Sequence, residues 1–205
     1  MPATDTDAER MDMDAQVQDV LDFWFLPPDN PDYGQSRVEW FRKDDGFDAQ
    51  IRERFGALID AAIEGGLLAW DTTPHGALAR LIVLDQFTRN VHRGTPRAFA
   101  GDALALALAV ALTDAGQDRQ LSPMLRAFAY LPFEHAEDLA MQARAVELFQ
   151  LLSQAQPGFD GMLDYAERHQ EVIARFGRFP HRNAILGRAS TPQELEFLRQ
   201  PGSSF

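Results

Sequence analysis

Apolar side chains recur every three or four residues along most of the chain, which is the period of an amphipathic α-helix. The first such stripe runs from Val17 to Phe25 and stops at Pro27, and a second spans 47–64 and ends at Gly65. No segment alternates strictly between apolar and polar residues with hairpin turns at its ends, so a β-sheet is not supported. The pattern therefore predicts an all-α protein.

Four later helices are predicted to begin with the same device, a hydroxyl residue followed by proline. The hydroxyl can cap the helix, and proline at the first helical position lacks only an N–H that would have no partner there. These pairs are Thr73-Pro74, Thr95-Pro96, Ser122-Pro123 and Thr191-Pro192, the last with Glu194 placed to complete a capping box. The predicted helices span 74–91, 96–115, 122–131 and 192–199, and periodicity adds 134–154 and 159–176, with Pro132 separating two of them. Seven to nine helices with short links indicate antiparallel helical hairpins, in a bundle or a short solenoid.

Length and composition are those of one globular domain. The chain has 205 residues, 45% of them hydrophobic, which is enough for a sizeable core. We expect residues 1–14 to form a disordered acidic tail ahead of a single all-helical domain over 15–205.

No signal peptide is visible, and the absence of cysteine excludes disulfides, thiolate catalysis and cysteine-based metal sites, which fits a cytoplasmic protein. Asp102 and Asp114 interrupt the most apolar stretch, so we expect a soluble chain that does not span a membrane.

Charge is distributed unevenly along the chain. The formal net charge is −12, of which residues 1–75 carry −11. That N-terminal part would repel nucleic acids and anionic membranes. Residues 175–188, in contrast, hold four arginines, one histidine and no acid. RNA binding through this stretch is the weakest of the functional hypotheses, and nucleic acid is an unlikely partner.

A first polar cluster follows the apolar part of the predicted helix 74–91. Asp85 and Arg89 are four residues apart, as are Gln86 and Asn90, so each pair shares a helix face, and Arg93 follows one turn later. A helix that turns polar in this way either reaches solvent with one surface salt bridge or enters a polar cavity. The sequence leaves both readings open.

A second cluster surrounds His135, with Glu134, Glu137 and Asp138 beside it. Three acids around one histidine could raise its pKa or offer carboxylates to a metal. Acids at the start of a helix also favour the helix dipole, which explains the acids but not the histidine.

A third cluster begins at His169, which falls on the apolar stripe of the helix 159–176. A single histidine in such a place is more often a hydrogen-bonded core residue than a ligand. His181, Arg182 and Asn183 follow in the arginine-rich stretch, and these residue types suit a carboxylate or phosphate. A structural arginine network that ties helix ends together explains the stretch equally well.

Several chemistries lack their motifs in this chain. There is no phosphate-binding glycine loop, no dinucleotide fingerprint and no nucleophile elbow, and no two of the five histidines stand four residues apart as in zinc proteases. We therefore predict no cofactor and no metal.

Five sequence blocks carry a resemblance to a known family. They are W-x-x-T-P-x-G-x-L-A from Trp70, L-D-Q-F-x-R-N from Leu84, R-G-x-P-x-A-F from Arg93, P-x-E-H-x-E-x-L from Pro132, and R-F-G-R-F-P-H-R-N-x-x-L-G-R-x-S-T from Arg175. In these blocks, from Val17 to the last helix, the chain resembles the bacterial family catalogued as domain of unknown function 924. The resemblance implies a TPR-like fold, and it places the polar clusters within the family's signature blocks. Ala136 stands where the family pattern has serine, which counts against a hydroxyl nucleophile there.

The first functional hypothesis is a pocket for a small anionic ligand, with a catalytic role left open. His135, Glu137 and His181 are the candidate catalytic residues, because a histidine with a carboxylate partner can move protons. The candidate ligand-binding residues are Asp85, Arg89, Asn90, Arg93, His169, Arg182 and Asn183. The alternative is a TPR-like module that binds a peptide or protein in a groove lined by aromatic residues at 24–25 and 40–41, with the arginines as structural network.

Overall fold

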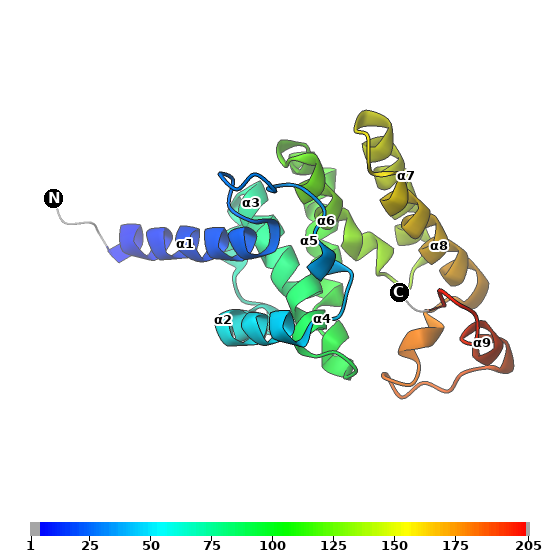
Figure 1. Ribbon diagram of the computed structural model, residues 1–205. Helices are drawn as coiled ribbons and strands as arrows, with labels where there is room; N and C mark the ends of the chain where they lie inside the picture. The colour runs from blue at the N-terminus through cyan, green and yellow to red at the C-terminus, as the bar shows by residue number, and fades with distance from the viewer. Residues whose placement is uncertain (1–4, 204–205) are drawn as a thin grey trace.

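The regular elements of residues 5–203, the part of the chain that this computed structural model describes, are all helical (Figure 1). The α-helices are α1 (Asp5–Phe25), α2 (Asp45–Ile63), α3 (Pro74–Leu81), α4 (Thr88–Val91), α5 (Asp102–Asp114), α6 (Pro123–Glu134), α7 (Leu139–Ala155), α8 (Asp160–Phe176) and α9 (Pro192–Phe197). Shorter turns join them: η1 (Val38–Trp40), η2 (Leu68–Thr72), η3 (Ile82–Phe87), η4 (Pro96–Phe99), η5 (Gln117–Gln120) and η6 (Pro180–Arg182). Helices adjacent in the chain pack together, so the predicted all-α fold is confirmed.

Two of the four predicted hydroxyl caps form, those at Thr73 and Thr191, whereas Thr95 and Ser122 make no side-chain cap hydrogen bond. The Thr73 side chain accepts a hydrogen bond from the Gly76 amide at 3.0 Å, with Pro74 at the first helical position. The capping box of α9 is complete, since the Thr191 hydroxyl accepts from the Glu194 amide and the Glu194 carboxylate accepts from the Thr191 amide. Local hydrogen bonds of this kind depend on neighbours in sequence, which is why they could be predicted.

The boundary expected at Pro132 is wrong. Helix α6 continues through this proline to Glu134, and the amide of His135 still bonds to the carbonyl of Leu131 at 2.9 Å. Proline removes one helical hydrogen bond, and here the loss falls in the last turn. Helix α7 then begins at Leu139 rather than at 134, because Asp138 is its cap and accepts from the amides of the two residues after Leu139.

The apolar segment Pro96–Asp114 is long enough and apolar enough to cross a membrane by length and composition, with a mean hydropathy of 1.3. Contrary to the expectation from the sequence, the composition of this segment therefore does not by itself exclude a membrane span. In the structure the segment is not one continuous helix, since the turn η4 and helix α5 meet at Gly101. Ala105, Ala109 and Leu112 of α5 are buried in the hydrophobic core, where a helix of a globular protein would place them.

An aromatic core joins α1 to the middle of the chain. Trp24 and Phe25 are buried, and the Trp40 ring packs against Trp24 and against Phe128, with centroids 6.0 and 4.6 Å apart. Of the four aromatic residues at 24–25 and 40–41, from which the groove hypothesis was drawn, only Phe41 is largely exposed, at 69%. These rings stabilise the core instead of lining an aromatic groove.

The N-terminal segment also differs from expectation. Helix α1 begins at Asp5 and so includes most of the stretch 1–14 that was expected to be disordered, while residues 1–4 lie outside the described residues. Residues 5–14 contain no glycine or proline, and acids near a helix start favour the dipole, so a helix is locally acceptable there.

In Figure 1, α7 and α8 lie side by side, and α9 sits near the C-terminal end of α8.

Candidate functional site

A π-helical turn interrupts the long helix that carries the first polar cluster. Helix α3 passes into η3, a π-helix over Ile82–Phe87, and continues as α4. The amide of Thr88 bonds to the carbonyl of Val83, five residues back, and the Thr88 hydroxyl donates to the same carbonyl at 2.9 Å. Single π turns inside helices occur frequently at functional sites. Asp85 lies in this turn.

Asp85 and His135 form a buried hydrogen-bonded pair. The Nδ1 atom of His135, at the end of α6, lies 2.7 Å from Oδ1 of Asp85. The Arg89 guanidinium lies 3.2 Å from the same oxygen, and the Gln86 amide donates to the other oxygen at 2.6 Å. An ionised carboxylate only accepts hydrogen bonds, so Nδ1 of His135 carries the proton and the Nε2 atom of the neutral ring is left as an acceptor.

The surroundings of this pair keep Asp85 ionised and His135 neutral, which are the protonation states in which His135 can accept a proton. Burial alone would raise the pKa of Asp85, but its interactions with His135 and Arg89, among them the hydrogen bond from the imidazole, outweigh burial and hold that pKa far below its ordinary value. Burial lowers the pKa of His135, and although Asp85 opposes this effect, Arg89 adds to it. At neutral pH Asp85 is therefore ionised and His135 is uncharged.

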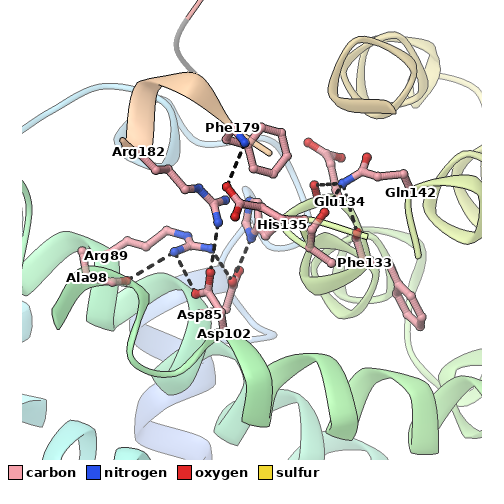
Figure 2. A network of polar contacts seen from close by, with 12 residues as sticks. Asp85, Arg89, Ala98, Asp102, Phe133, Glu134, His135, Gln142, Phe179 and Arg182 are labelled. Atoms are coloured by element: carbon pink, nitrogen blue, oxygen red, sulfur yellow. Dashed lines mark hydrogen bonds and ion pairs between the residues drawn. The ribbon is translucent and has the colours of Figure 1, made fainter. Parts of the chain in front are cut away.

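Two guanidinium groups meet at Asp102, the first residue of α5 (Figure 2). Arg89 lies 3.0 Å from one Asp102 oxygen, and Arg182 of η6 lies 3.3 Å from the other. Gly101 makes this approach possible, because a Cβ atom there would lie only 2.2 Å from the carbonyl oxygen of Leu84 in the π turn. The fold thus brings residues 85–89, 102, 135 and 182 to one place.

Arg182 is held between two aromatic rings. Its guanidinium lies 4.5 Å from the Phe179 centroid and 4.8 Å from the Phe99 centroid. Burial and the charge of Arg89 lower its pKa to about 10, so it stays charged at neutral pH. Its Nε atom is buried and has no hydrogen-bond partner among the described residues. Arg182 therefore has one donor that the described residues leave without an acceptor.

A second, uncharged layer lies next to His135. The His169 ring is 6.4 Å from the His135 ring, and its Nδ1 atom lies 2.8 Å from the Tyr165 carbonyl and 3.1 Å from the Glu134 carboxyl group. Burial lowers the pKa of His169 to about 3, while burial and the charge of Asp85 raise the pKa of Glu134 to about 8. Both groups are therefore predominantly neutral at pH 7, and His169 is a hydrogen-bonded core residue.

Glu137 is committed to a structural clamp. Its two carboxylate oxygens accept hydrogen bonds from the Arg188 guanidinium at 2.5 and 2.8 Å, and one of them also accepts from the Phe179 amide at 2.8 Å. Burial opposes ionisation, but these hydrogen bonds lower the pKa of Glu137 below its ordinary value. Arg188 in turn donates to the side-chain oxygen of Asn183 at 3.0 Å. The predicted residues Glu137 and Asn183 thus anchor the segment that carries Arg182.

The remaining predicted residues lie in different surroundings. Asn90 and Arg93 both donate to Asp48 of α2, at 2.7 and 2.6 Å, so they belong to another cluster. His181 packs near Phe179, with centroids 5.6 Å apart, and burial and Arg182 lower its pKa to about 4.

Two residues that matter here were not predicted as site residues. Asp102 joins Arg89 to Arg182, and Gln142 of α7 donates to three carbonyls around the end of α6, those of Phe133, Glu134 and Ala136. Both interactions join segments through tertiary contacts, so spacing in the sequence gave no signal for them.

Two surface hollows lie elsewhere in the described part of the chain. The residues that line one include Gln18 and Leu125, and those that line the other include Thr113 and Leu152. Neither lining includes Asp85 or His135. The anion pocket expected from the sequence is not among these two hollows and stays a prediction. Within residues 5–203, no group of three histidine or carboxylate side chains is placed to hold a metal ion.

The fold and the site define an all-α bacterial-type protein with a buried network of arginine, histidine and carboxylate side chains. Residues 20–202 match the family model described as "Bacterial protein of unknown function (DUF924)", and the chain belongs to this family. A solved structure of a protein of unknown function, ATU0120 from Agrobacterium tumefaciens, is 41% identical, with a TM-score of 0.78 over 91% of this chain and 98% of that one. No curated protein matches the chain.

Proposed function

We propose that this protein binds a small anionic molecule at the Asp85–His135–Arg182 cluster and that His135 acts there as a base. The observation that carries the proposal is the Asp85–His135 hydrogen bond of 2.7 Å with two guanidinium groups beside it. A carboxylate that holds one imidazole nitrogen leaves the other to take a proton, and arginines beside it would bind a carboxylate or phosphate.

Access to the cluster rests on its partly exposed side chains. Asp85 is 3% exposed, but His135, Arg89 and Asp102 are 17, 19 and 23% exposed, so the network reaches the surface from the buried carboxylate outward. An incoming anion would compete with Asp102 for the two guanidinium groups. The unpaired Nε of Arg182 offers one further donor.

The arginine-rich stretch supports this reading over nucleic-acid binding. The Arg178 guanidinium donates hydrogen bonds to Glu194, and the Arg188 guanidinium donates to Glu137. The Arg182 side chain is buried. These side chains are therefore committed within the fold and do not form a basic surface.

The alternative, a TPR-like module that binds a peptide, draws on the packing of α7 against both α6 and α8 through short connections. Its aromatic groove is absent from the described residues, since Trp24, Phe25 and Trp40 pack in the core. We therefore place the anion-binding reading first.

A ligand screen by thermal unfolding tests the proposal. The probes are inorganic phosphate, acetate and succinate, and the variants are Arg182→Ala, Arg182→Lys and the surface control Arg199→Ala, whose native side chain is 76% exposed. A probe at about 100 times its Kd should add about 2.7 kcal/mol of stability, or roughly 5–10 °C in Tm. We expect that shift in the wild type and in Arg199→Ala and its loss in both Arg182 variants. The proposal fails if no probe shifts Tm, or if the shift survives in a folded Arg182 variant.

A further inference from the structure

A second polar hollow lies away from the Asp85–His135 cluster, between η5, α6 and α7. It has a volume of about 240 Å³ and a mixed lining. Three arginines from three different elements line it, Arg119 of η5, Arg126 of α6 and Arg144 of α7. Two acids, Asp118 and Glu147, line it as well, so the formal charge of the lining is positive in a chain whose net charge is −12.

The arginines differ in how far their donors are used. The Nε and Nη2 atoms of Arg126 donate to the carbonyls of Asp118, Arg119 and Leu121, at 3.2 to 3.4 Å. Within the described residues these bonds leave the Nη1 group of Arg126 without a partner and fix the guanidinium in place. A guanidinium that is already immobilised loses little conformational entropy when it binds an anion.

The acids of the hollow are occupied. Asp118 is buried and accepts a hydrogen bond of 2.6 Å from the Tyr130 hydroxyl, which engages one of its carboxylate oxygens. Glu147 pairs with Arg144 one turn away on α7, at 2.7 Å, and both side chains are partly exposed. Such an exposed pair is weak and gives way readily to a better-placed anion.

One wall of the hollow is apolar. Leu148 and Leu152 are buried in the core, whereas Leu151 is 56% exposed. An exposed leucine next to three arginines provides the two surfaces that an amphiphilic anion needs, a cationic rim for the head group and a hydrocarbon wall for the tail.

We propose that this hollow binds a carboxylate that carries an alkyl chain, with the head group on Arg119, Arg126 and Arg144 and the chain along Leu151. This site is independent of the proposed anion site at His135. The head group supplies charge complementarity, and each buried methylene of the chain should strengthen binding about fourfold.

Isothermal titration calorimetry with acetate, hexanoate and octanoate tests the proposal on the full chain, with octanol as the uncharged analogue of octanoate. The affinity should rise with chain length, and octanol should bind at least tenfold more weakly than octanoate. If octanoate binds no more tightly than acetate, or octanol binds as well as octanoate, the site is not the one proposed.

Variants at exposed positions locate the binding while leaving the fold intact. The double variant Arg119→Gln/Arg144→Gln should weaken octanoate binding at least tenfold, and Leu151→Ser should flatten the dependence on chain length. The matched control is Arg168→Gln/Arg199→Gln, which removes two exposed arginines on α8 and at the end of α9. Equal weakening in this control would mean that net charge, and not the hollow, governs binding, and would overturn the proposal.

The same variants separate this site from the one at His135. Arg182→Lys should leave octanoate binding within about twofold of the wild-type value. Conversely, Arg119→Gln/Arg144→Gln should keep the thermal shift with phosphate. If Arg182→Lys abolishes octanoate binding, the carboxylate binds at the His135 cluster and the second site is refuted.

Discussion

Glu134 gives the sharpest test of the buried network. This carboxyl group is 4% exposed, and burial together with the charge of Asp85 raises its pKa to about 8. In the unfolded chain the same group has its ordinary pKa of 4.5. Between these two values the folded state holds a proton that the unfolded state has released, so the free energy of unfolding falls as the pH rises.

The expected magnitude follows from the two pKa values. The stabilisation is fully present below pH 4.5 and is lost as the pH rises through 8, at about 1.36 kcal/mol for each pH unit in between. Glu134→Gln cannot titrate and has nearly the same shape as the protonated acid. Between pH 6 and pH 9, wild-type stability should therefore fall by roughly 2–3 kcal/mol relative to Glu134→Gln.

Urea denaturation followed by circular dichroism at pH 6, 7, 8 and 9 measures this difference directly. Glu147→Gln serves as the control, because Glu147 is 57% exposed and its removal should leave the pH dependence of the wild type unchanged. Parallel curves for wild type and Glu134→Gln from pH 6 to 9 would refute the reasoning, since Glu134 would then be ionised in the fold throughout that range.

Further changes test the contacts around the site. Asp85→Asn removes a buried charge that faces Arg89, so it should lower stability by about 3–5 kcal/mol by urea denaturation, and it should also lower the pKa of Glu134. Gly101→Ala should lower the free energy of unfolding by roughly 1–3 kcal/mol or more, because the new Cβ would lie 2.2 Å from the Leu84 carbonyl oxygen. Its control, Gly56→Ala, adds a Cβ in open space on α2 and should raise the free energy of unfolding by about 0.5–1 kcal/mol. Asp138→Ala should cost about 1 kcal/mol in a thermal melt through loss of the α7 cap, and an unchanged Tm would contradict that role.

Elements whose cause is local could be predicted from the residues alone. Helical periodicity placed the helices, and the cap at Thr73 and the capping box at Thr191 formed as the residues predicted. It also singled out several side chains of the polar network, though not Asp102, because an apolar helix that turns polar at Asp85 and a histidine on an apolar stripe at His169 are unusual. What local signals could not give was the partner of each side chain.

Those partners depend on how distant segments pack against one another. The π turn places Asp85 against His135, which lies fifty residues later in the chain. Gly101 allows Asp102 to join Arg89 to Arg182, and Arg182 lies eighty residues after Asp102. The same packing sent Asn90 and Arg93 to Asp48 and committed Glu137 to Arg188. A side chain's charge and hydrogen bonds depend on which distant segment reaches it, and burial then sets its pKa. The residue types of the network could therefore be predicted from the sequence, while its connections and protonation states came from the fold.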